Sequence, residues 1–88
     1  MAQYLQMSAT GQVKVGAGRL YGVLISSTSS GTITIYDTHD GDTSNDPKIL
    51  DTFTPTAGQI ISFGPGVIFS RGLYCVEGST LVWTVIYE

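Results

Sequence analysis

The chain has 88 residues, of which 42% are hydrophobic and only 12% are charged, and its formal net charge at pH 7 is −3. A chain of this length has room for one small domain. Its few basic residues are scattered along the sequence, so we expect no nucleic-acid partner. No stretch has the unbroken apolar length of a membrane span, and the first residues lack the pattern of a secretory signal.

A domain of this size is only marginally stable unless something reinforces it. Cys75 is the only cysteine and cannot form an internal disulfide, and His39 is the only histidine, so no recognised set of zinc ligands can be assembled. With so few charges, much of the surface must be uncharged. We therefore predict that the chain forms an oligomer that covers part of this surface. A single free thiol is typical of a protein made in a reducing cytoplasm.

The N-terminal residues differ from the remainder of the chain. Residues 1–12 carry Tyr4, Leu5 and Met7 without an evident strand partner, and we interpret them as an arm or tail before one domain of residues 13–88. Beyond them, apolar residues alternate with a period of two in short runs separated by turn residues, which is typical of strands. No helix is predicted. The eight predicted strands are Gln12–Val15, Arg19–Ser26, Thr32–Asp37, Lys48–Thr54, Gln59–Phe63, Val67–Phe69, Leu73–Glu77 and Thr80–Tyr87.

The connections between most of these runs are short and rich in glycine, which favours antiparallel neighbours because parallel strands need longer crossovers. The spacing of the turns indicates an all-β fold, a small antiparallel β-sandwich resembling a jelly roll, with a small closed barrel as the alternative. The strand order stays open.

Some predicted strands are apolar on both faces. In Thr80–Tyr87, Trp83 lies on the more apolar face and Ile86 on the opposite one, and Arg19–Ser26 shows a similar pattern. In so small a sandwich, a strand that is apolar on both faces indicates a contact between subunits. Because the N-terminal arm could also lie on a neighbour, the interface candidates are Tyr4, Leu5, Met7, Trp83 and Ile86.

No catalytic set is predicted. His39 lies in a polar loop, Thr38–Pro47, where a solvated side chain is expected, and Cys75 alternates with Leu73 in an apolar strand, where an inert buried thiol is expected. A nucleophile, a base and an orienting group that converge are therefore missing, and we predict that the chain is not an enzyme and binds no cofactor.

The same loop is rich in oxygen ligands, which raises the question of calcium. It contains Asp40, Asp42, Asn45 and Asp46, directly after Asp37. The spacing does not match the ligand pattern of a calcium loop of the helix–loop–helix type, and clustered loop carboxylates are commonly just solvated. We therefore predict no metal site. The glycine-rich stretches are followed by strands rather than by a helix N-terminus, so they are interpreted as turns and bulges and not as a phosphate site.

Several stretches together resemble the short virion proteins of tailed bacteriophages that decorate or cement the head or form the base of head fibres. These stretches are G-R-L-Y-G-V-L-I-S-S from Gly18 to Ser27, G-T-I-T-I-Y-D from Gly31 to Asp37, D-T-F-T-P-T-A-G from Asp51 to Gly58, G-V-I-F-S-R-G-L-Y from Gly66 to Tyr74 and the final T-V-I-Y-E. The resemblance implies a jelly-roll-like sandwich, a homotrimer, that binds the major capsid protein on the outside of the head, with a head fibre protein as a further partner. It implies a protein made in the bacterial host cytoplasm and assembled into the virion, without active-site residues.

A second function of another class stays open. The chain could be a carbohydrate- or receptor-binding β module of a fibre or knob, in which the Asp-rich loop and a tyrosine bind a glycan. Binding to a free sugar distinguishes this module from a decoration protein, which binds only the assembled capsid.

Overall fold

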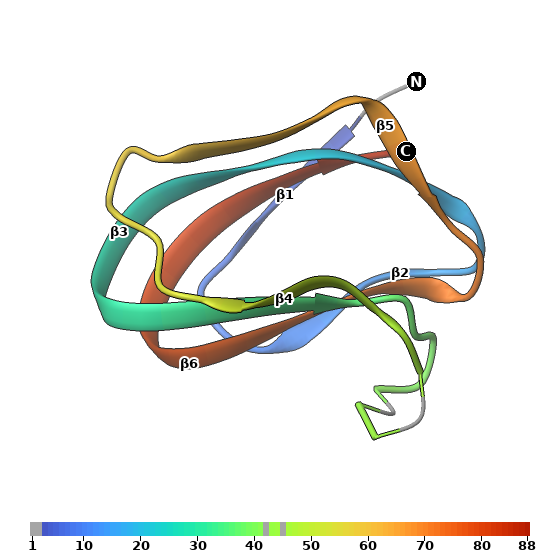
Figure 1. The fold of residues 1–88 in the computed structure, drawn as a ribbon, viewed down its shortest axis with the longest axis horizontal. Coiled ribbons are helices and arrows are strands. Elements are labelled where there is room, and N and C mark those ends of the chain that lie inside the picture. Colours follow the sequence, from blue (N-terminus) through green and yellow to red (C-terminus); the bar gives the residue numbers. More distant parts are fainter. Residues whose placement is uncertain (1–2, 42, 45) are drawn as a thin grey trace.

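The computed structural model describes residues 3–41, 43–44 and 46–88, and these residues form six strands and no helix (Figure 1). The strands are β1 (Gln3–Met7), β2 (Gly11–Val15), β3 (Gly18–Tyr36), β4 (Lys48–Phe53), β5 (Ile60–Phe69) and β6 (Gly72–Tyr87). All of the strand pairs are antiparallel. The prediction of an all-β antiparallel fold is confirmed.

The two longest strands form the centre of the fold. β3 and β6 pair with each other along most of their lengths, from the Leu20–Tyr87 pair to the Tyr36–Tyr74 pair. Both strands bend in the middle, at Ser30 and Ser79, which have positive φ angles of 58° and 70°. Such left-handed backbone conformations redirect a strand that would otherwise continue straight. Beside the bend, a Cβ atom on Gly31 would lie 2.5 Å from the Thr80 backbone oxygen, so only glycine fits there.

The bends fold the sheet over into two layers (Figure 1). The terminal layer, which holds the first strand and the end of the last strand, has the order β1, β6, β3, β5, and uses residues 80–87 of β6 and 18–28 of β3. The loop layer has the order β2, β6, β3, β4, and uses residues 72–78 of β6 and 31–36 of β3. At the end opposite the bends, two tight turns cross between the layers, and the N–H of Gly16 donates to the Arg71 carbonyl at 2.8 Å.

The number of strands differs from the prediction for a physical reason. Three pairs of predicted strands are each one continuous strand. β3 and β6 pair with each other on both sides of the serines and glycines that are typical of turns, and β5 pairs with β3 on both sides of a register shift at residues 63–66. The other difference lies at the N-terminus. Gln3–Met7 is strand β1, which pairs with β6 without a break from Gln3–Tyr87 to Met7–Trp83. The prediction of a separate arm is therefore wrong for residues 3–12, and residues 1–2 lie outside the described part.

The core fills the space between the layers. Its fully buried members alternate along the strands with residues that face outward, and they are Leu20, Val23, Ile25, Ile33, Ile35, Phe69, Leu73, Cys75, Leu81, Trp83 and Val85. Trp83 is the largest of them and has no exposed surface. Its place among the interface candidates is therefore wrong: the more apolar face of β6 packs against the chain's own second layer.

Candidate interaction surface

The outer face of the terminal layer carries two rows of residues that lie side by side across four strands. We call these eight residues the contact face: one row is Tyr4, Ile86, Gly22 and Ser62, and the other is Gln6, Thr84, Leu24 and Ile60. They face away from the core because they alternate along their strands with residues of the core or residues packed against it, as Ile86 does with Val85, or lie opposite such an outward residue, as Tyr4 does opposite Ile86. The contact face is therefore held in place by backbone pairing rather than by loops.

The contact face carries four exposed large hydrophobic side chains and no charged side chain. Tyr4 is 75% exposed, Ile60 71%, Ile86 39% and Leu24 38%. These four make up half of the eight large hydrophobic residues that are exposed in the described part of the chain. A concentration of this kind on one side of a small domain marks an interaction surface more often than scattered single residues do.

Charged groups border the contact face at one end only. Arg19 and Glu88 pair there through their backbones, with N–H to carbonyl distances of 3.0 and 2.8 Å. The Tyr21 hydroxyl donates to the Glu88 carboxylate at 3.1 Å, and burial together with this hydrogen bond raises the pKa of Tyr21 above its usual value. An apolar centre with polar groups at its edge is the usual anatomy of a protein–protein interface.

The structure places only two of the five interface candidates from the sequence on the contact face. Tyr4 and Ile86 lie opposite each other on the contact face. Leu5 points to the core side of β1, Met7 packs against the core, and Trp83 lies inside it. Sequence reasoning missed Leu24 and Ile60. The signal for them was a second apolar face in the predicted strand at Arg19–Ser26 and the doublet of isoleucines at the start of β5.

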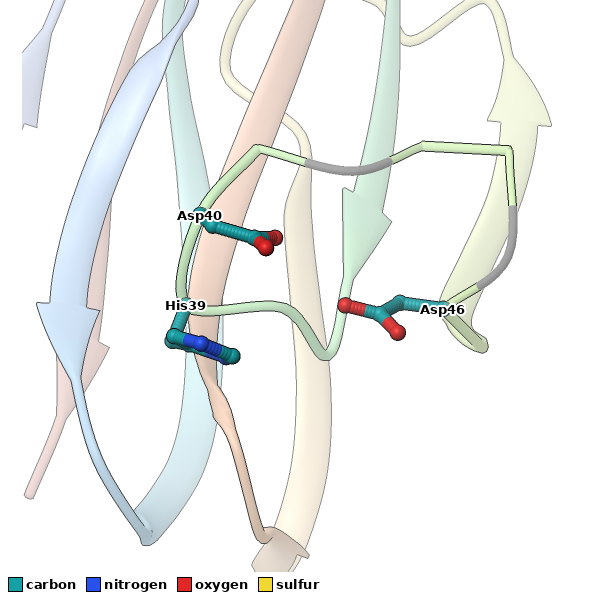
Figure 2. A group of neighbouring side chains, drawn as sticks. All are labelled: His39, Asp40 and Asp46. Atoms are coloured by element: carbon teal, nitrogen blue, oxygen red, sulfur yellow. The ribbon is translucent and has the colours of Figure 1, made fainter.

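The loop between β3 and β4 brings His39, Asp40 and Asp46 together, with possible ligand atoms all within 4.8 Å of one another (Figure 2). Together they offer one imidazole nitrogen and two carboxylate oxygens as ligand atoms. In the structure, however, Asp46 forms an ion pair with the Arg71 guanidinium, which donates a hydrogen bond to it at 3.0 Å, and Asp40 accepts a hydrogen bond from the Thr38 hydroxyl at 2.9 Å. Asp42 and Asn45, also considered as calcium ligands, lie outside the described residues.

The surroundings of Asp37 and Cys75, the two other residues considered for chemistry, indicate that both stabilise the fold. The Asp37 carboxylate accepts hydrogen bonds from backbone N–H groups in the turn between β5 and β6. Burial raises the pKa of the Cys75 thiol to about 12, and the neighbouring Trp83 indole only partly opposes this rise. The indole N–H has no hydrogen-bond partner among the described residues. A thiol with so high a pKa is protonated at neutral pH and is a poor nucleophile.

No pocket is found in the described part of the chain. Those same residues contain no helix long and apolar enough to cross a membrane. Comparisons of the chain with models of protein families, with curated proteins and with solved structures found no match.

Proposed function

We propose that the protein is a structural virion protein that decorates and stabilises the outside of a tailed-phage head, and that it attaches through the contact face. The observation that supports this proposal is the arrangement of that face, on which exposed Tyr4, Leu24, Ile60 and Ile86 lie in two adjacent rows that contain no charged side chain. The choice of the phage head as the assembly rests on the resemblance of the sequence to head decoration proteins. The major capsid protein is the proposed partner.

The physical basis of the proposal is buried area. A decoration protein that covers a seam between coat subunits adds contact that must be broken before the subunits separate. The backbone of the contact face is already ordered by strand pairing, so binding costs little conformational entropy. Several copies held together would dissociate more slowly than one, which fits the proposed function as an oligomer, a trimer according to the resemblance.

The test is sedimentation of the protein with undecorated heads assembled from the cognate capsid protein. Ile60→Lys places a charge in the contact face, and we expect binding to fall at least tenfold because the charge would have to be desolvated. Val15→Lys is the matched control, since Val15 is 68% exposed but lies on β2 in the loop layer. Equal binding of the two variants would contradict attachment through the contact face.

The second candidate function, glycan binding, is favoured by one observation in the loop layer. Tyr36 and Tyr74 are opposite each other, the Lys48 ammonium lies 5.9 Å from the Tyr36 ring centre, and Gly41 of the Asp-rich loop lies close to the Tyr74 ring. Paired aromatic side chains beside polar groups can stack on a sugar. The test is a glycan panel. If the wild type binds a glycan but not heads, and Tyr36→Ala abolishes the glycan binding, this function is favoured over decoration.

A further inference from the structure

Strand β1 is the outermost strand of the terminal layer, and β6 is its only strand partner among the described residues. Alternate backbone N–H and C=O groups of such an edge strand point away from the sheet and can pair with another chain. The sequence of β1, Q-Y-L-Q-M, contains no charge, proline or glycine, and its five consecutive pairs with β6 show no shift in register. The edge is therefore regularly paired with β6 and contains none of the residues that block pairing with another strand.

Each of the other outer strands carries a feature that discourages pairing. β2 has a register shift between Gln12 and Lys14, and β4 has shifted pairing and the charged side chains of Lys48 and Asp51. β5 is interrupted by residues 64–66, Gly-Pro-Gly, in which both glycines have positive φ. Bulges, charges and proline are the devices by which natural sheets prevent edge-to-edge association. Their absence from β1 sets this edge apart.

Leu5 gives a second, independent indication. It lies opposite Val85, which is completely buried, so its side chain is on the core side of the sheet. Leu5 is nevertheless 37% exposed, because none of the described strands lies beyond β1 to cover its outer flank. A strand added at this edge would extend the core over Leu5 and bury the remainder of its apolar surface.

We propose that β1 pairs antiparallel with β1 of a second copy of this chain, so that the two terminal layers form one continuous sheet. Around a two-fold axis at Leu5, each Leu5 faces the other, Tyr4 faces Gln6, and Gln3 faces Met7. These pairs also match in face, since Tyr4 and Gln6 belong to the contact face and the others to the core side. The chain has a net charge of −3, yet this edge brings no like charges together.

The pairing has a consequence for binding. Tyr4 and Gln6 lie in β1, so the contact faces of the two copies would adjoin across the shared edge and form one uncharged surface of twice the size. The inference rests on the self-association included in the proposed function but does not depend on the capsid. It replaces the trimer implied by the resemblance with a symmetric pair.

The test is the solution mass of the purified chain by sedimentation equilibrium. We expect twice the chain mass of 9.4 kDa for the wild type, and the single-chain mass for Leu5→Lys and for Leu5→Glu, because each places two like charges at the axis. Mixing these two variants should restore the double mass. Val67→Lys is the matched control: Val67 is 36% exposed, lies on outer strand β5 opposite buried Leu20, and its substitution should leave the double mass unchanged.

Hydrogen exchange on the wild type avoids any effect of the substitutions on folding. Amide exchange in β1 should slow as the protein concentration rises, while exchange in β5 should not change. A wild-type monomer, a trimer, or a dimer that both Leu5 variants keep would overturn the inference. Head binding is measured separately with Ile60→Lys. A wild-type dimer that does not bind heads would contradict the proposed function but would still support the β1 pairing.

Discussion

The Asp37 carboxylate lies against the turn between β5 and β6, with its Oδ1 atom 2.8 Å from the backbone nitrogen of Arg71. The same carboxylate accepts hydrogen bonds from the N–H groups of Ser70 and Gly72, at 3.1 and 3.2 Å. One side chain at the end of β3 therefore supports the crossing between the two layers. Asp37 was a candidate calcium ligand in the sequence, but its oxygens serve the chain's own backbone.

We expect Asp37→Ala to lower the free energy of unfolding at pH 7 by about 2 kcal/mol, because three backbone donors lose a charged acceptor. Although burial raises the pKa of Asp37, the hydrogen bonds from Ser70, Arg71 and Gly72 outweigh it and hold the pKa below the usual 3.8. A lowered pKa means that this stabilisation is present above pH 4 and is lost as the pH falls through the pKa of the folded state. Urea unfolding at pH 7 and near pH 2 measures both effects.

Asp51→Asn is the control for this prediction. Asp51 forms an exposed ion pair with Lys48 at 3.0 Å, and such surface pairs contribute little to stability. The urea midpoint at pH 7 should therefore stay near that of the wild type. If Asp37→Ala were equally harmless, or if its effect persisted undiminished in acid, the role given to the carboxylate would be wrong.

Trp83 and Ile86 test which face of β6 belongs to the core. Trp83→Ala should cost about 3–5 kcal/mol because it leaves a large cavity, and this is a large part of the stability of a small domain. Ile86→Ala should cost about 1 kcal/mol or less, since Ile86 is on the exposed contact face. Thermal unfolding followed by circular dichroism compares them. Similar losses for both variants would contradict the assignment of the faces.

Cys75 should resist alkylation as long as the protein is folded. Its sulfur is buried and its pKa is about 12, so almost no thiolate is present or accessible at pH 8. Mass spectrometry after treatment with iodoacetamide should show no modification of the native protein. In about 6 M guanidinium, which unfolds even very stable domains, modification should be complete. Rapid modification of the native protein would show that the core around Cys75 opens readily.

Deletion of residues 1–12 should destabilise the domain rather than remove a tail. The deletion eliminates β1 and the beginning of β2, exposes the edge of β6, and removes Met7 from the core. We expect a loss of roughly 3 kcal/mol or more from the lost apolar burial alone. Circular dichroism and a urea titration measure the outcome. A truncated protein with the wild-type midpoint would restore the interpretation of this segment as a separate arm.

The sequence predicted the individual strands better than it predicted their limits. Alternation identified the regions of β2, β4 and parts of the longer strands, because the pleat of a strand sends successive side chains to opposite faces. It divided β3 at Ser30 and β6 at Ser79, where the residues are typical of turns. Whether such residues end a strand or bend it depends on the neighbouring strand, which continues beside them. Local sequence carries no signal for that difference.

The sequence by itself determined an all-β antiparallel domain with few charges and with strands that are apolar on two sides. Only the tertiary structure decided which side is the core: Trp83 faces the second layer, whereas Ile86 faces outward beside Tyr4. The physical reason is that alternation is local, while burial depends on which segments, distant in the sequence, lie above and beside a strand. The same long-range pairing placed Gln3–Met7 at the edge of the sheet and brought Leu24 and Ile60 onto the contact face.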